Sequence, residues 1–442
     1  MKILFTADIH IGRRSSRLPG SADSARHSCA AVWSRIVDHA IAEQVDLVLA
    51  SGDLVDEANR FLEAIGPLER GLQRLREVGI ETVAVSGNHD HEVLPAIADQ
   101  IGEGGLRLLG RRGRWERYTF ENRSGERVHL DGWSFPRGRV EESPLASYAP
   151  LFPDNAPVLA LLHADVDSPG SSFAPVASVE MRRFPGVLFL LGHIHRTRGI
   201  NEPGGARFLY AGSPQAMDPG ETGAHGAWIL EFGAAGNSVR HLPLSTVRYE
   251  TIEVDIGGVS RPEDAQGRLH GALREHLEEI AGQSGPLELV RYRPRITGAT
   301  RFPRLIEEKL AGSDETLEVP SGRLTGTVEV LHFAMKPERD LEALAAGVGA
   351  PAVLARLLLS PDNLPPALRD ELRRKVNEIH SSTVFVEVSG VEVSGGEAKG
   401  GEADEADPAG SDDSASRTTA MDAELMRAAA VLLEELLGQK VA

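Results

Sequence analysis

This chain of 442 residues is poor in cysteine and in aromatic residues. Cys29 is its single cysteine, which excludes an intramolecular disulfide and a metal cage of thiolates, and favours a reducing compartment. Aromatic residues make up 5% of the chain, so few rings are available on which the bases of a single-stranded nucleic acid can stack. Any metal must therefore be bound through nitrogen and oxygen atoms.

The sequence also lacks a long apolar run. A membrane-spanning helix needs roughly twenty apolar residues, and no segment approaches that length. The first residues, MKILFTADIH, begin like a secretion signal, but the apolar stretch is too short and runs directly into Asp8. We therefore expect a cytoplasmic protein that does not contact a membrane.

Basic residues are scarce, with 47 Lys and Arg against 65 Asp and Glu and a net charge of −18. Proteins that bind nucleic acid usually gain affinity when Lys and Arg displace counterions, so this balance at first disfavours such a substrate. The distribution changes that interpretation, because residues 387–442 contain 4 basic and 13 acidic residues and account for −9 of the total. The remainder of the chain is only mildly acidic, and the composition does not exclude DNA.

Five short apolar runs each end in residues that bind hard metal ions. Buried strands of an α/β sheet have such continuous Val, Ile and Leu runs, and their carboxyl ends line one crevice. Asp, Asn and His are suitable ligands for Mn, Fe or Zn, and two ions need about eight protein ligands between them. The sequence therefore predicts a dinuclear metal site whose ligands are Asp8, His10, Asp53, Asn88, His163, His193 and His195.

The local motifs differ in how much they specify. Asp8 and His10 are two residues apart and face the same side of an extended chain, but for such a pair taken alone a solvated strand end is the more common explanation. In GDLVD, Asp53 follows a glycine that permits a tight turn, so its carboxylate can bridge two ions. GNHDH contains the neutral ligand Asn88, followed by His89 and Asp90, and is more specific.

The organisation of the chain indicates several domains. Short apolar runs alternate with helix-like segments such as 24–42 and 57–78, which is typical of a layered α/β domain, and helices near 261–281 and 302–311 accompany further strands. A Gly-, Ser- and acid-rich stretch lacks the apolar side chains needed for a core. We predict an α/β domain over 1–246, a small α+β cap over 247–337, helices over 338–388, a disordered acidic linker over 389–420 and an amphipathic helix over 421–442.

Arginines recur in the predicted cap. The strand RYRPRI alternates them along one face, and spaced guanidinium groups are suited to phosphate backbones. A solvated edge strand protected by charge is an equally good interpretation. The candidate DNA-binding residues are Arg291, Arg293, Arg295, Arg301 and Arg304.

The motifs DxH, GDxxD, GNHD, a single His and GHxH, in this order, resemble the calcineurin-like metallophosphoesterase superfamily. Within it, ADIHIG, GNHDHE, GHIHR and GETGAHG are similar to the DNA-repair exonucleases of the SbcD and YhaO type, bacterial relatives of the meiotic-recombination nuclease. The likeness covers residues 1–245 well and the rest more loosely. Where many relatives carry a lysine in the segment corresponding to GETGAHG, this chain has His225.

This resemblance implies a four-layered α/β/β/α sandwich and a pair of divalent ions, with manganese as the expected metal. It implies that Asp8, His10 and His195 bind one ion and that Asn88, His163 and His193 bind the other, with Asp53 as the bridge. His89 would be the catalytic acid, oriented by Asp90.

The function that the resemblance implies is a metal-dependent DNA exonuclease and single-strand endonuclease in DNA repair, whose terminal helices bind an SMC-like coiled-coil ATPase. A phosphatase or cyclic-nucleotide phosphodiesterase on the same site better explains the acidic charge, but leaves the cap and tail without a role. A non-catalytic scaffold for an ATPase is a third hypothesis, which the complete set of predicted ligands does not favour. The sequence does not indicate the polarity of cleavage or whether the protein forms a homodimer.

Overall fold

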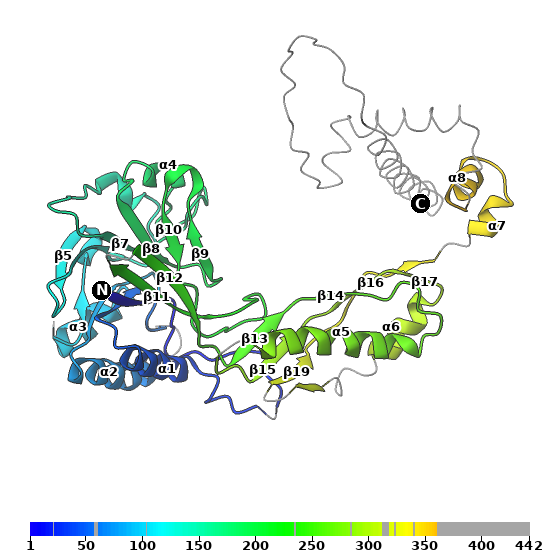
Figure 1. Cartoon of the computed structure of the whole chain (residues 1–442), viewed down its shortest axis with the longest axis horizontal. Coiled ribbons are helices and arrows are strands. Elements are labelled where there is room, and N and C mark those ends of the chain that lie inside the picture. Colours follow the sequence, from blue (N-terminus) through cyan, green and yellow to red (C-terminus); the bar gives the residue numbers. More distant parts are fainter. Residues whose placement is uncertain are drawn as a thin grey trace, which may run out of the picture. The chain divides into compact units, whose positions relative to one another are not determined.

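A computed structural model describes residues 1–20, 22–56, 61–102, 104–233, 236–282, 285–311, 318–321, 324–338 and 341–359. The chain divides into two compact units, Met1–Pro337 and Glu338–Ala442 (Figure 1). The predicted acidic linker 389–420 and terminal helix 421–442 lie outside the described residues, as does the end of the predicted helical segment 338–388 beyond residue 359.

The first sheet of unit Met1–Pro337 has the strand order β12-β11-β1-β2-β3-β4. Its central strands are parallel, and β11 and β12 join them as an antiparallel hairpin. The buried parallel strands correspond to the continuous apolar runs of the sequence. The strands are β1 (Lys2–Thr6), β2 (Leu47–Ser51), β3 (Glu81–Val85), β4 (Arg107–Leu108), β11 (Gly226–Gly233) and β12 (Gly236–Pro243).

A second sheet, with the order β5-β6-β7-β8-β10-β9, packs against the first. Side chains alternate along the strands, so that Phe5 and Leu161 fill the space between the sheets while Leu4 and Leu162 face outward. The strands are β5 (Glu116–Glu121), β6 (Arg127–Trp133), β7 (Val158–His163), β8 (Val187–Gly192), β9 (Arg198–Asn201) and β10 (Phe208–Tyr210).

Helices α1 (Cys29–Ala42), α2 (Phe61–Glu77) and α3 (Val93–Ile101) cover the outer face of the first sheet. Helix α1 begins after Ser28, whose hydroxyl accepts a hydrogen bond from the Ala31 N–H, and this cap explains why the helix begins later than the predicted residue 24. Over the second sheet, the described outer layer consists of loops and the short helix α4 (Ser178–Met181). The predicted sandwich of two sheets is confirmed.

Residues 247–337 form further sheets. The sheet with the order β13-β15-β19-β18 has helix α5 (Asp264–Ala281) on one face, and helix α6 (Pro303–Ala311) packs against α5. Leu273, Tyr292 and Ile306 belong to one buried core cluster. Both helices agree with those predicted near 261–281 and 302–311. The strands are β13 (Val247–Glu250), β14 (Glu253–Asp255), β15 (Leu289–Tyr292), β16 (Arg295–Thr297), β17 (Ala299–Thr300), β18 (Glu318–Ser321), β19 (Leu324–Val328), β20 (His332–Phe333) and β21 (Lys336–Pro337).

The described part of unit Glu338–Ala442 contains helices α7 (Leu341–Ala345) and α8 (Ala350–Leu359). Leu354, Ala355 and Leu357 are buried, whereas Val353 and Leu359 are exposed. Across the described ranges, every helix is too short or too polar to span a bilayer.

Candidate metal centre

The predicted ligands lie in loops that follow the strands of both sheets, except His163, which is the last residue of β7, and hydrogen bonds join the loops that follow β1 and β2. The Asp8 N–H donates to Gly52 O over 3.1 Å, and the His10 N–H donates to Asp53 O over 2.9 Å. Gly52 has a φ of +87°, and a Cβ atom there would lie 2.5 Å from His163 Nδ1, so this turn requires glycine, as the sequence indicated.

Four predicted ligands have a left-handed backbone although none is glycine. The φ angles are 51° at Asp8, 50° at His10, 52° at Asp53 and 93° at His193. Such conformations cost on the order of 1–3 kcal/mol each and persist where the surrounding structure enforces them, which is common at functional sites. The loops are therefore shaped around the position of these side chains.

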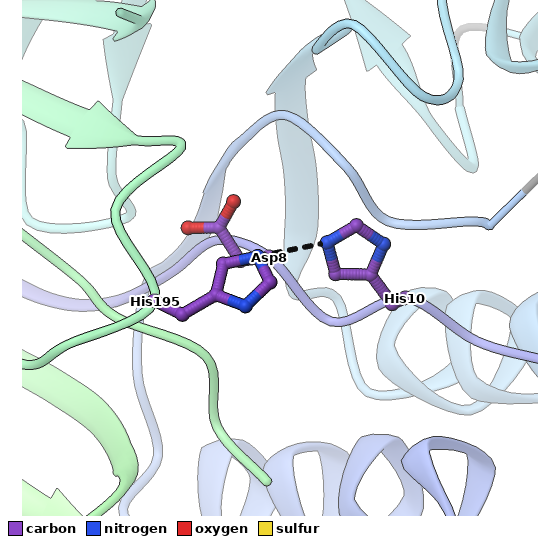
Figure 2. A group of neighbouring side chains, drawn as sticks. All are labelled: Asp8, His10 and His195. Carbon is purple, nitrogen blue, oxygen red and sulfur yellow. Dashed lines mark hydrogen bonds between the residues drawn. The ribbon is translucent and has the colours of Figure 1, made fainter. Parts of the chain in front are cut away.

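Asp8, His10 and His195 form one cluster, in which the three ligand atoms lie within 4.8 Å of one another (Figure 2). His10 Nε2 and His195 Nε2 are 3.2 Å apart. Two imidazole nitrogens at this distance share either a proton or a cation. The separation suits two ligands of one ion, because metal–nitrogen bonds of about 2.1 Å place neighbouring ligand atoms about 3 Å apart.

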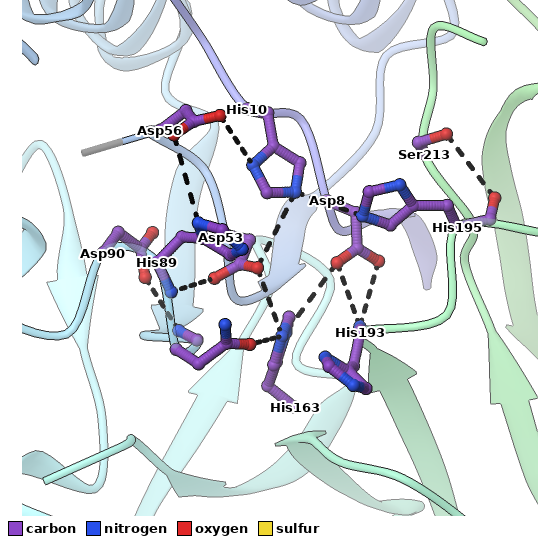
Figure 3. Close-up of polar contacts among 12 residues, drawn as sticks. Asp8, His10, Asp53, Asp56, His89, Asp90, His163, His193, His195 and Ser213 are labelled. Atoms are coloured by element: carbon purple, nitrogen blue, oxygen red, sulfur yellow. Dashed lines mark hydrogen bonds and ion pairs between the residues drawn. The ribbon is translucent and has the colours of Figure 1, made fainter. Parts of the chain in front are cut away.

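Asp53 lies between His10 of this cluster and His163, which forms a second cluster with Asp8 and Asp53 itself. Its Oδ2 is 3.7 Å from His10 Nε2 and 3.3 Å from His163 Nε2 (Figure 3). Asn88 Oδ1 is 3.1 Å from the same His163 nitrogen. His163 Nδ1 lies 3.0 Å from Ser51 O and donates to it, which leaves Nε2 free as a ligand. The donor atoms therefore fit two hard cations that share the Asp53 carboxylate.

His193 is adjacent to these clusters. Its backbone N–H donates to both carboxylate oxygens of Asp8 over 2.9 and 3.1 Å, and its ring centroid lies 5.2 Å from that of His163. Its Nε2 is 3.5 Å from Asp165 Oδ2. Among the described residues, the three groups of clustered acidic and imidazole ligands do not include His193, so its place as a ligand stays a prediction.

His89 lies at the edge of the clusters, with 43% of its side chain exposed. The backbone N–H of His89 donates to Asp53 Oδ1 over 2.9 Å. The His89 ring lies edge-on to the His10 ring, with the ring centroids 5.0 Å apart. The Asp56 carboxylate lies near both rings, 3.9 Å from His89 Nδ1 and 3.8 Å from His10 Nδ1. Asp56 is the second acid of GDLVD and was missed by the sequence analysis.

The Asp90 carboxylate, expected beside the His89 ring, has another environment. It is fully buried and accepts hydrogen bonds from the backbone N–H groups of Leu54, over 2.8 Å, and Gly87, over 2.7 Å. Asp90 therefore joins the GDLVD loop to the GNHD loop. Asp56 is a carboxylate near the His89 ring, and the orientation of that ring by Asp90 stays a prediction.

Burial and mutual contact shift the pKa values of the clustered groups in opposite directions. Burial raises the pKa of Asp8 to about 6, and burial together with the Asp53 charge raises the pKa of Asp90 to about 7. Burial opposes the charged imidazole of His163, but Asp53 and Asp8 outweigh it and raise that pKa to about 9. Burial likewise opposes ionisation of Asp53, while His163 and His10 hold its pKa below the usual range. The site thus places negative charge beside imidazoles that accept protons or cations.

Two more carboxylates contact predicted ligands from outside the clusters. Asp165 lies beside His193, and Glu221 Oε1 lies 2.7 Å from His195 Nδ1. Glu221 belongs to the GETGAHG segment, 26 residues after His195. The sequence offered no spacing signal for either contact, although GETGAHG was noted.

The candidate DNA-binding arginines occupy different surroundings. Arg291 is only 8% exposed, and its Nη1 donates to Thr327 Oγ1 over 2.7 Å within the sheet. Arg293 is partly buried. The exposed members are Arg295, Arg301 and Arg304. Burial of Arg291 favours a structural role for that side chain, whereas the exposed arginines keep their predicted role.

Comparison with known proteins places the site in a family. Residues 1–197 match the calcineurin-like phosphoesterase family. YhaO of Bacillus subtilis, an uncharacterized metallophosphoesterase, is 28% identical over 50% of this chain and 54% of its own length. The DNA double-strand break repair protein Mre11 of Methanosarcina mazei is 25% identical over 63% of this chain and 43% of its own.

The SbcD component of the SbcCD nuclease of Rhodobacter capsulatus is 28% identical over 77% of this chain and 91% of its own length. Against YhaO and Mre11, this chain spans about half of the relative's length. Metallophosphoesterases use a dinuclear divalent metal site, and the clusters around Asp53 provide candidate ligands for one. Residues 1–197 therefore form a calcineurin-like phosphoesterase domain.

Proposed function

We propose that this protein is a dinuclear-metal-dependent DNA nuclease that acts as an exonuclease, and as an endonuclease on single strands, in DNA repair. The observation that carries the proposal is the convergence of carboxylate, amide and imidazole donors around Asp53 in a phosphoesterase domain. The choice of DNA as substrate is supported by the relatives, which include a double-strand break repair protein and a component of a nuclease.

The proposed ligand sets are Asp8, His10 and His195 for one ion and Asn88, His163 and His193 for the other, with Asp53 shared and Mn²⁺ as the expected metal. When bound, two such ions lower the pKa of a water molecule and neutralise phosphoryl oxygens. The protein's own contribution is to fix the donors. Ser51 O sets the tautomer of His163, and the loops are tied by the Asp8–Gly52 and His10–Asp53 hydrogen bonds.

His89 is the proposed general acid. Its ring is partly exposed at the edge of the clusters, so a substrate can reach it, while its backbone is fixed by the hydrogen bond to Asp53. Histidine is the commonest side chain in this task, which here is protonation of the departing sugar oxygen. We assign Asp56 to holding the His89 ring and Asp90 to holding the two loops together.

The proposed partner is an SMC-like ATPase. A relative that covers most of this chain is a component of the SbcCD nuclease, which supports assembly with a second protein. In the described part of the second unit, α8 exposes Val353 and Leu359. We expect Val353→Asp, and separately removal of residues 421–442, to weaken capture of the purified coiled-coil ATPase while metal-dependent cleavage stays intact.

One assay separates the nuclease from a small-ester phosphodiesterase on the same site. Metal-depleted protein is reloaded with Mn²⁺ or Mg²⁺ and given end-labelled duplex DNA, single-stranded DNA and bis-p-nitrophenyl phosphate, with Asp53→Asn as the inactive control. We expect metal-dependent release of nucleotides from DNA. Cleavage confined to the small ester in both metals would reject the nuclease.

A further inference from the structure

We propose that Glu221 is a positioning residue of the metal centre, because its carboxylate sets the tautomer and orientation of the His195 imidazole. This inference rests on the metal site of the proposed function. Glu221 is not among the predicted ligands and lies on the side of His195 opposite to His10.

The contact between Glu221 and His195 is short and directional. Glu221 Oε1 lies 2.7 Å from His195 Nδ1, so the Nδ1–H donates to the carboxylate. The lone pair of His195 is then on Nε2, the atom that lies 3.2 Å from His10 Nε2. A carboxylate that accepts from a ligand imidazole fixes the ring and makes it a stronger ligand.

Glu221 is itself held in place. Its Oε2 accepts hydrogen bonds from the Met217 N–H over 2.8 Å and from the Ser213 hydroxyl over 3.2 Å. The Ser213 N–H in turn donates to His195 O over 2.9 Å. These contacts form a closed ring through His195, Glu221 and Ser213. The carboxylate, with 13% of its side chain exposed, has little freedom to leave the imidazole.

The backbone of the Glu221 loop is anchored on a neighbouring strand. Thr222 forms an isolated parallel β-bridge with Tyr249 of β13, and the Gly223 N–H donates to Tyr249 O over 3.1 Å. Gly223 has a φ of +96°, which favours glycine at this turn. Strand β13 belongs to the sheet that follows the phosphoesterase domain, so that sheet supports a residue of the metal centre.

His225, the histidine of GETGAHG, contacts backbone carbonyl groups of the same loop. It is 1% exposed, and its ring nitrogens lie 2.8 Å from Ser213 O and 3.1 Å from Glu221 O. His225 thus spans the two ends of the loop that carries the carboxylate. Its position in the structure is internal.

The carboxylate contact of His10 is longer than that of His195. Among the described residues His10 Nδ1 is buried without a hydrogen-bond partner, and Asp56 Oδ2 is 3.8 Å away. The contrast predicts that His195 is the more firmly oriented imidazole of its cluster. Removing the Glu221 charge should therefore loosen metal binding at that cluster.

The test uses full-length, metal-depleted protein titrated with Mn²⁺ by isothermal titration calorimetry. Glu221→Gln keeps the shape but removes the charge, and we expect Mn²⁺ affinity at one site to fall roughly 10- to 100-fold. The control is Glu202→Gln, which removes a carboxylate that pairs with Arg207 at the surface over 3.1 Å and should leave both affinities unchanged. Glu221→Asp keeps the charge with shorter reach and should fall between wild type and Glu221→Gln.

A structural loss is separated by thermal unfolding of the metal-free variants. If Glu221→Gln does not fold, the milder Ser213→Ala, which removes one hydroxyl donor to Oε2, should still lower Mn²⁺ affinity about twofold to fivefold. Wild-type affinity in Glu221→Gln, or in Ser213→Ala when that is the variant measured, would overturn the inference even if DNA is cleaved. A wild-type protein that binds Mn²⁺ but cleaves no DNA would reject the nuclease and leave the Glu221 test intact.

Discussion

Two regions of this molecule bury charged side chains, and they do so differently. In the metal centre, the buried Asp53 faces the imidazoles of His10 and His163 within 4 Å. On the sheet of β13 and β15, Arg291 and Arg293 each have a buried Nε without a hydrogen-bond partner among the described residues. The first arrangement is complementary and centred on one point, as a cation site requires. The second follows from strand alternation, and Arg291 donates a hydrogen bond to the hydroxyl of Thr327 in the neighbouring strand.

The largest expected effect on activity comes from replacing Asp53 in the metal centre. Asp53→Asn removes the proposed bridging carboxylate, so we expect Mn²⁺ binding at both sites to weaken and cleavage to fall by at least about 10³-fold, since metal ions supply several kcal/mol to such reactions. The measurements are Mn²⁺ titration and turnover of labelled duplex DNA. Asp99→Asn, at an exposed pair with Arg111, is the matched control. Retained Mn²⁺ stoichiometry in Asp53→Asn would reject the shared-ligand assignment.

His89→Asn tests whether His89 acts as the general acid. We expect kcat to fall roughly 10²- to 10⁴-fold, as for loss of a general acid, with Mn²⁺ affinity unchanged. Asp56→Asn should give a smaller loss, of about 10-fold, because the His89 ring keeps its backbone position but loses a nearby carboxylate. Steady-state kinetics with parallel Mn²⁺ titration separates these outcomes. Equal kcat in wild type and His89→Asn would remove the assignment.

Asp90 distinguishes a structural acid from a catalytic one. Asp90→Ala leaves the buried N–H groups of Leu54 and Gly87 without their acceptor, and each unsatisfied donor costs about 1–3 kcal/mol. We expect the free energy of unfolding of the metal-free protein to fall by about 2–6 kcal/mol, as two such donors lose their acceptor. Urea unfolding measures this loss. A stable Asp90→Ala protein with low kcat would instead support the catalytic role predicted for Asp90.

Within the described ranges, the pKa of His241 on β12 is not raised by a carboxylate as that of His163 is. Burial, with a smaller contribution from His225, lowers its pKa from 6.5 to about 4. The unfolded chain therefore takes up this proton as the pH falls below about 6.5 while the folded chain does not until about 4, so stability is lost on acidification. At about 1.4 kcal/mol per pKa unit, this proton uptake lowers the free energy of unfolding by about 2 kcal/mol at pH 5 relative to neutral pH.

The variant His241→Phe keeps a ring against Trp228 and removes the titrating group. Metal-free wild type and variant are compared by urea unfolding at pH 7.5 and pH 5.0. The wild type should lose more stability between these two pH values than His241→Phe. Identical losses would show that the folded-state pKa of His241 is ordinary.

The sequence predicted the candidate functional residues that follow strand ends. It was less informative about contacts and burial that depend on tertiary packing. The glycine before Asp53 and the order of the motifs predicted which loops would meet, because parallel strands end at one edge. Glu221 could not be predicted, since its contact with His195 depends on how the loop before β11 folds back onto the end of β8. Alternation placed Arg291 and Arg293 on one face, but burial of Arg291 follows from its neighbours Tyr249 and Thr327 in the adjacent strands.

The smallest expected effect concerns DNA affinity. Arg295 is exposed on β16, so Arg295→Ala should weaken duplex binding a few-fold and reduce the salt dependence of affinity by about one counterion. Arg291→Ala should instead lower stability, because that side chain is held by Thr327 within the sheet. Fluorescence anisotropy of a labelled duplex over a salt series measures the first effect, with Arg207→Ala as a surface control of equal charge change. If Arg207→Ala and Arg295→Ala shift the salt slope equally, only net charge matters and the cap strand is not the DNA-binding face.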